Sequence, residues 1–247
     1  MAQYAAINAT WIVLVCAAAI LIAAASYFRG RLGYVLLAAG LFAVLGAGAA
    51  AINTDALSSL DTSVADWFDA HRTRRRDVEA MGIFAYLGRP VHVLSVALVV
   101  GALLSARARS AKPVILVTGG VAVGVAVEQT FKALIGRTAT TQPLVEYPHS
   151  YPSGHVTGCA ALIGMIALCA GVGRGRATKT VLAVLVAASV LFVAWLALYT
   201  GAHTFTDVIG GMALGGAILA LGAAALTGST PAASGPHNHS EAGVRSA

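Results

Sequence analysis

Charged side chains are scarce in this chain of 247 residues. Asp, Glu, Lys and Arg make up 11% of it, whereas a soluble domain carries about 25%. Hydrophobic residues make up 58%, and they gather in blocks of about 20, the length of a helix that crosses roughly 30 Å of hydrocarbon. The scarcity of charge therefore excludes an ordinary soluble globular domain and predicts an integral membrane protein.

Cysteine is scarce as well. The three cysteines, Cys16, Cys159 and Cys169, lie in apolar segments, where cysteine behaves as a small hydrophobic residue. This placement indicates neither a disulfide framework nor a metal site. The net charge is +6, but basic residues in a membrane protein mostly encode its orientation. We therefore expect no nucleic-acid partner.

The apolar blocks predict an all-α fold with about seven membrane-spanning helices. Their expected limits are approximately residues 9–28, 33–52, 81–104, 113–135, 154–172, 180–199 and 205–226. No basic residue precedes the first block, so we expect an uncleaved helix there rather than a cleaved signal peptide.

Two segments differ from the apolar blocks. Segment 53–80 mixes both charges, and Trp67 and Phe68 stand among acidic residues, which predicts an amphipathic helix at the membrane interface. The C-terminal segment is rich in Ser, Pro, Ala and Gly and is expected to be disordered. The predicted organisation is an additional helix with a short basic loop at 1–32, a membrane core at 33–227, and a cytoplasmic tail at 228–247.

The short loops between the blocks alternate in charge. Loops 28–31, 105–112 and 174–179 hold eight basic residues and no acidic one. The positive-inside rule places these loops in the cytoplasm. Segment 53–80 and the loops before the fifth and seventh blocks then lie on the extracytoplasmic side.

Polar residues gather at this extracytoplasmic end of the core, where each one needs a partner or a function. They are Lys132 near the end of the fourth block, Ser153, Gly154 and His155 at the start of the fifth, and His203 and Asp207 at the start of the seventh. A helix that begins at Gly154 offers unpaired N–H groups and the positive end of its dipole. Ser153 can cap this helix, and Lys132 adds positive charge. Together these groups suit a phosphate.

The two histidines complete a reactive site. His203 and Asp207 are four residues apart and share one helix face. A carboxylate on one ring nitrogen fixes the tautomer and leaves the other nitrogen available for attack. His155 can donate the proton that a leaving alkoxide needs. The residues therefore predict a nucleophile, an orienting carboxylate and a general acid, with no metal or other cofactor.

Each of these residues also has an ordinary structural explanation when it is taken singly. Ser153 and His155 are consistent with a helix cap beside a buried histidine. His203 and Asp207 are consistent with a structural ion pair, and Lys132 with an ion pair to Glu128 one turn earlier. Their convergence on one side of the membrane is what favours a shared site.

Three stretches resemble the signatures of the type 2 phosphatidic acid phosphatases, or lipid phosphate phosphatases. The family pattern is Lys, six residues and Arg-Pro; then Pro-Ser-Gly-His; then Ser-Arg, five residues, His, three residues and Asp. "YPSGH" at 151–155 matches the second signature, "HTFTD" at 203–207 matches the end of the third, and "KALIGRTAT" at 132–140 is similar to the first. The resemblance covers about residues 33–226 and implies a six-helix phosphatase core plus one additional N-terminal helix.

The resemblance also implies a role for each matched residue. His203 would form a phosphohistidine intermediate that Asp207 orients, and His155 would protonate the leaving group. Lys132, Ser153 and Gly154 would hold the phosphate oxygens.

The sequence departs from the signatures at two places. Ala139 and Thr140 stand where the family has Arg-Pro, and Leu196 and Ala197 stand where it has Ser-Arg. A hydrogen bond to a charged group contributes about 1.5–3 kcal/mol, so both losses weaken phosphate binding. Arg137 lies two residues before the first vacant position and is the expected replacement. Further candidates are Arg89 and the arginine run 74–76.

These observations predict a metal-independent phosphatase in the plasma membrane of a bacterium. Its expected substrate is a lipid phosphate or polyprenyl diphosphate at the extracytoplasmic face, and its other partners are membrane lipids. One alternative is a phosphate-lipid binding or scaffold protein whose catalysis lapsed with the two arginines. Another is a transporter, although a transporter site should lie near the midplane. The sequence does not indicate an oligomeric state.

Overall fold

The structure is a computed structural model that describes residues 2–136 and 150–227. The described residues form helices joined by short turns. The helices are α1 (Ala2–Tyr27), α2 (Arg31–Ala51), α3 (Asp55–His71), α4 (Arg74–Leu87), α5 (Pro90–Ala108), α6 (Lys112–Ile135), α7 (Gly154–Ala170), α8 (Arg176–Tyr199) and α9 (Phe205–Thr227). The expected tail at 228–247 lies outside the described residues.

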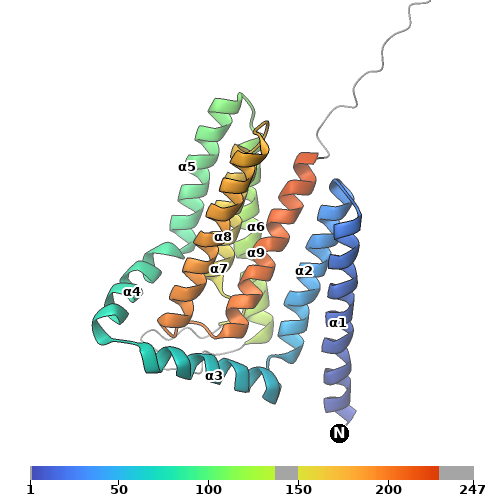
Figure 1. Ribbon diagram of the computed structural model, residues 1–247, viewed down its shortest axis with the longest axis vertical. Helices are drawn as coiled ribbons and strands as arrows, with labels where there is room; N and C mark the ends of the chain where they lie inside the picture. Colours follow the sequence, from blue (N-terminus) through green and yellow to red (C-terminus); the bar gives the residue numbers. More distant parts are fainter. Residues whose placement is uncertain (1, 137–149, 228–247) are drawn as a thin grey trace, which may run out of the picture.

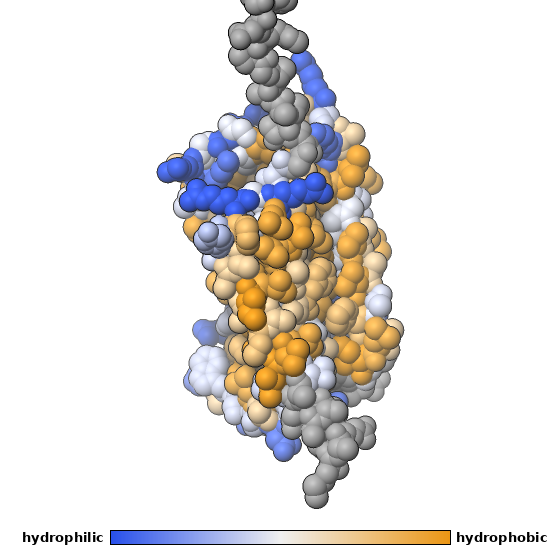
Figure 2. Space-filling model, turned by 90° about the vertical axis from the view of Figure 1, so that its right-hand side faces the viewer, coloured by the Kyte–Doolittle hydropathy of each residue, from blue (hydrophilic) through white to orange (hydrophobic). Residues whose placement is uncertain are grey.

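Six of these helices are long and apolar enough to cross a membrane, namely α1, α2, α5, α6, α8 and α9. The fifth expected span, 154–172, corresponds to α7, which is apolar but has 17 residues, a length of about 25 Å at 1.5 Å per residue. In Figure 1 the long helices stand side by side, while α3 lies across one end of the bundle. Figure 2 shows a broad hydrophobic band between hydrophilic ends. The predicted all-α membrane protein is confirmed.

Helix α9 lies at the centre of the bundle and packs on α2, α6 and α7. Its packing surface consists largely of glycine and alanine, which lets helix backbones approach closely inside a membrane. A side chain on Gly215 would collide with Ala160 of α7, and one on Gly211 would meet the Ser153 backbone at 2.7 Å. This close approach brings the first turns of α7 and α9 together.

The segment between the second and third spans differs from the prediction. Segment 53–80 is not one helix, because the chain is extended at Arg72 and Thr73, between α3 and α4. The third span begins at Pro90 rather than at residue 81. Proline has no N–H and suits the first turn of a helix, and it favours an extended conformation in the residue before it. The apolar residues 81–87 therefore belong to α4.

Candidate active site

His203 is held in the turn between α8 and α9. Gly201 adopts a left-handed backbone conformation, with φ of 68°, and α9 begins four residues later at Phe205. The N–H of Thr204 donates to Oδ2 of Asp207 at 3.0 Å, and the N–H of Asp207 donates to the hydroxyl of Thr204 at 3.3 Å. This reciprocal arrangement is a capping box. It fixes the Asp207 carboxylate beside the His203 ring.

The His203–Asp207 pair lies in the protein interior. Nδ1 of His203 is 3.6 Å from Oδ2 of Asp207, and their side chains are 3% and 0% exposed. The hydroxyl of Ser150 donates to the other carboxylate oxygen at 3.4 Å. The structure thus brings the histidine and the carboxylate together, but His203 lies in the turn before α9 and only Asp207 lies on the helix, so the predicted shared helix face is replaced by a turn packed on the first helical turn.

The first turn of α7 meets this pair. The N–H of Ser153 donates to the backbone carbonyl of Asp207 at 2.9 Å, and its hydroxyl caps α7 by accepting from the N–H of Val156 at 3.5 Å. The ring of His155, two residues later, lies 6.1 Å from the ring of His203, centroid to centroid. One histidine from the first turn of α7 and one from the α8–α9 turn therefore lie side by side.

Lys132 reaches the same end of the bundle from α6, but it is ion-paired. Its Nζ lies 2.6 Å from Oε1 of Glu128, and both side chains are largely buried. The Glu128 carboxylate also lies against Gly154, where a side chain would collide with it. The alternative pairing considered from the sequence is therefore present. A carboxylate of the protein itself stands at the start of α7.

Two residues of α4 and its C-terminal cap cover His155, and neither was predicted from the sequence. The ring of Phe84, which is fully buried, stacks on His155 at 3.8 Å between centroids and meets His203 edge-on at 6.2 Å. Gly88 lies so close to His155 that any side chain there would enter the imidazole. Nε2 of His155 is buried and has no hydrogen-bond partner in the described part of the chain. No local sequence pattern marked Phe84 or Gly88 for this role.

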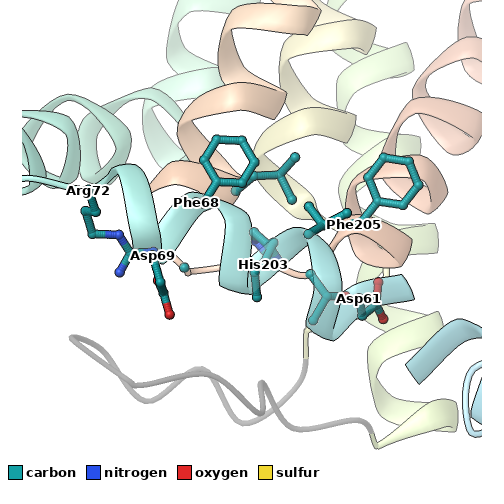
Figure 3. A pocket seen from close by; sticks show the side chains of 11 residues that line it. Asp61, Phe68, Asp69, Arg72, His203 and Phe205 are labelled. Carbon is teal, nitrogen blue, oxygen red and sulfur yellow. The ribbon is translucent and has the colours of Figure 1, made fainter. Parts of the chain in front are cut away.

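Helix α3 forms the outer wall beside His203. A cavity of about 20 Å³ lies between α3 and the α8–α9 turn, and His203, Asp61, Phe68, Asp69 and Arg72 are among its lining residues (Figure 3). The carboxylate of Asp61 is buried and accepts two hydrogen bonds of 2.8 Å from the N–H and hydroxyl of Thr206. This contact holds α3 against the first turn of α9.

Ala139 and Ala197 stand where the family has arginine, and of these two the structure describes only Ala197. Arg137, Ala139 and Thr140 lie outside the described residues. Ala197 is fully buried and packs in an apolar cluster with Phe68 and Phe84. Its carbonyl accepts the N–H of His203 at 3.2 Å. No cationic side chain therefore comes from position 197.

The fold and this site define a helical membrane protein with two neighbouring histidines, a buried His203 and a half-buried His155, at one end of its bundle. The sequence profile of the PAP2 superfamily matches residues 93–230, which include both histidines, and the chain belongs to that superfamily. No curated protein matches the chain.

A solved structure supports the same assignment. The chain is similar to the crystal structure of a transmembrane PAP2-type phosphatidylglycerolphosphate phosphatase from Bacillus subtilis, with a TM-score of 0.65 and 25% sequence identity. The similarity covers 74% of this chain and 92% of that one. Family and structure together support a phosphatase that lies in a membrane.

Proposed function

We propose that this protein hydrolyses a lipid phosphate or polyprenyl diphosphate through a phosphohistidine at His203, without a metal ion. The placement of His203 carries the proposal, since the ring lies between the buried carboxylate of Asp207 and the ring of His155. A histidine whose Nδ1 faces a carboxylate presents Nε2 as its nucleophile.

In the first step, Nε2 of His203 attacks the phosphorus of the substrate. A nitrogen–phosphorus bond forms while the bond between phosphorus and the leaving oxygen breaks. His155 gives its proton to that oxygen, which leaves as a lipid alcohol or as a lipid monophosphate. Asp207 stabilises the positive charge that develops on the His203 ring.

In the second step, water replaces the enzyme nitrogen. His155, now neutral, accepts a proton from the water as it attacks phosphorus. The nitrogen–phosphorus bond breaks, His203 is regenerated and inorganic phosphate leaves. The proton returns His155 to its acid form for the next cycle.

The phosphate oxygens are held at the start of α7 in this proposal. Ser153, the N–H groups that follow Gly154, and Lys132 point to this region, and the helix N-terminus favours an anion. Arg137 is the remaining proposed ligand. Because Glu128 already offsets the charge of Lys132, this proposed phosphate-binding region is less positive than its residue types suggest.

An apolar groove supports a lipid substrate. It has a volume of about 450 Å³ and lies between α1, α2, α3 and α9. Its lining is apolar and includes Val15, Val44, Leu60 and Ile209. Phe205 lines both this groove and the cavity beside His203. We propose that the groove receives the acyl or prenyl chain while the phosphate lies at the histidines.

The proposed face of the membrane is the extracytoplasmic one. The histidines lie at the bundle end that α3 crosses. The basic loops 28–31, 105–112 and 174–179 connect the spans at the opposite end. Basic loops mark the cytoplasmic side, and a bacterial plasma membrane is the proposed location.

The test is phosphate release by the purified protein in detergent, without added metal. The substrates are phosphatidylglycerol phosphate, phosphatidic acid and a polyprenyl diphosphate. His203→Ala should abolish release, whereas His92→Ala should retain it, because His92 is exposed, stacks on Tyr86 and does not line the cavity at His203. Equal release by wild type and His203→Ala would rule out the proposed nucleophile.

A second candidate is a binding protein without turnover. The alanine at position 197 favours it, because the phosphate lacks a cation from that side. Orthovanadate, an anion that mimics the phosphoryl group in transfer, separates the two functions. Binding of orthovanadate without hydrolysis of any lipid in the panel would identify the binding protein.

A further inference from the structure

Arg72 lies beside the turn that carries His203. It follows the last residue of α3, and its side chain is only 20% exposed. Arg72 and His203 line the same cavity, and the Arg72 guanidinium lies beside Asp69 (Figure 3). A side chain on Gly201, two residues before His203, would lie 3.2 Å from Nη2 of Arg72. A cationic side chain therefore borders the cavity beside His203.

The ion pairs of Arg72 and Lys132 differ in strength. Lys132 is paired at 2.6 Å with Glu128, whose side chain is 6% exposed, and separating a buried pair leaves an uncompensated charge. Nη2 of Arg72 lies 2.9 Å from Asp69, whose side chain is 55% exposed. The pair is open to solvent on its Asp69 side, and solvent screening weakens such a pair. Of the two cations, Arg72 is the one that can exchange its partner for a substrate anion.

A second acidic residue orients Arg72 without occupying its outer nitrogens. Nε of Arg72 lies 3.9 Å from Oδ1 of Asp77, and this Nε has no hydrogen-bond partner within the described residues. A guanidinium has five N–H donors in a planar fork. Asp77 can therefore face Nε while Nη1 and Nη2 bind two oxygens of one phosphoryl group.

We propose that Arg72 binds the phosphoryl group of the substrate beside His203 and supplies the cation that position 197 lacks. This inference rests on the proposed function. The phosphoryl group displaces Asp69, which turns to solvent and widens the cavity. Arg72 lies outside residues 93–230, so the family match does not assign it this role. The interfacial helix α3 then contributes to the chemistry and not only to the membrane surface.

The experiment compares Arg72→Ala with Arg75→Ala. Arg75 belongs to the arginine run 74–76, but its side chain is 91% exposed, pairs with Glu79 and does not line the cavity beside His203. Phosphate release from phosphatidylglycerol phosphate and the dissociation constant of orthovanadate are measured for both. Arg72→Ala should weaken orthovanadate binding and lower kcat/KM by about 10- to 100-fold, the effect of one hydrogen bond to a charged group. Arg75→Ala should match wild type. Added guanidinium should restore part of the loss in Arg72→Ala, which a purely structural role does not allow.

The outcomes separate this inference from the proposed function. Turnover by wild type with equal orthovanadate binding by Arg72→Ala and Arg75→Ala overturns the role of Arg72 and leaves the phosphatase standing. Orthovanadate binding that depends on Arg72, without turnover, supports the role of Arg72 and overturns the phosphatase. Absence of both turnover and binding in wild type overturns both. If Arg72→Ala does not fold, Arg72→Lys provides the comparison, since one ammonium cannot bind two oxygens in a fork and should show an intermediate affinity.

Discussion

Oδ2 of Asp207 accepts the Thr204 N–H at 3.0 Å and lies 3.6 Å from Nδ1 of His203. The same oxygen therefore caps α9 and faces the histidine. Because the capping box fixes the carboxylate, the orientation of the ring depends on the helix start. The Asp207 side chain therefore serves both the start of α9 and the proposed chemistry at His203.

Asp207→Asn should separate these two roles. The asparagine oxygen can still accept the Thr204 N–H, so the melting temperature should change little. The neutral amide no longer stabilises a positively charged His203 or fixes its tautomer, so kcat should fall by about 10²- to 10⁴-fold. Asp66→Asn, on the exposed face of α3, is the matched control. A kcat equal to that of wild type would show that Asp207 acts only as a helix cap.

Much of the fold was predictable because the thickness of the hydrocarbon sets the length of a spanning helix. The starts of α2, α6, α7 and α9 fall within about two residues of their expected positions, a difference that is usual for helix ends. The start of α5 was placed too early. The apolar residues 81–87 continue the pattern of a span, and only Pro90 marks the break.

The site was predictable where contacts are local in sequence. His203 lies four residues before Asp207, and Lys132 lies four residues after Glu128. This spacing can be recognised in the sequence, although His203 precedes α9 and only the second pair lies on one helix. The contacts of Phe84 with His155 and of Arg72 with Gly201 join elements far apart in the sequence, and no periodicity encodes them. The sequence therefore suggested the arginine run 74–76, whereas the break after α3 places Arg72 at the cavity.

Glu128→Gln should make the site a stronger anion binder. The substitution keeps the size of the side chain but removes the charge that offsets Lys132. Orthovanadate affinity should rise about tenfold, because Lys132 gains an uncompensated charge for the anion. Without ligand the protein should lose stability, since removing one partner of a buried pair costs about 3–5 kcal/mol.

The control for this prediction is Glu79→Gln, which alters an exposed pair with Arg75 of the same spacing. It should change neither stability nor affinity measurably. Titration of orthovanadate while unfolding is followed measures both quantities at once. If Glu128→Gln weakened orthovanadate binding, Glu128 would help to hold the anion instead of competing with it for Lys132.

Gly88→Ala should impair the general acid. The new methyl group would enter the space of the His155 ring, so the imidazole must turn away from His203. Such overpacking costs about 1–3 kcal/mol of stability. The kcat should fall while KM changes little, because protonation of the leaving group matters only in the transition state.

Gly82→Ala is the matched control, because a side chain at this position of α4 has no atom within 4 Å. It should leave kcat unchanged and gain slightly in helix propensity. The two variants are compared by steady-state kinetics and thermal unfolding. Equal kcat values in both would mean that His155 does not act from its observed position.

Asp61→Ala should loosen α3 from the core. Its carboxylate accepts two hydrogen bonds from Thr206, and removal leaves buried donors without this partner, at a cost of about 1–3 kcal/mol. Asp66→Ala, which alters an exposed residue of the same helix, should cost less than about 0.5 kcal/mol. Hydrogen exchange of the α3 amides, followed in detergent, should accelerate in Asp61→Ala only.

Orthovanadate affinity then shows whether the packing of α3 on the core matters for the proposed active site. If Arg72 binds the phosphoryl group, freeing α3 withdraws the guanidinium from His203, and orthovanadate affinity falls in Asp61→Ala although the histidines are untouched. Faster hydrogen exchange of the α3 amides with unchanged orthovanadate affinity would place α3 outside the proposed active site. Helix α3 would then only cover the end of the bundle, and the cation beside His203 would have to come from another segment.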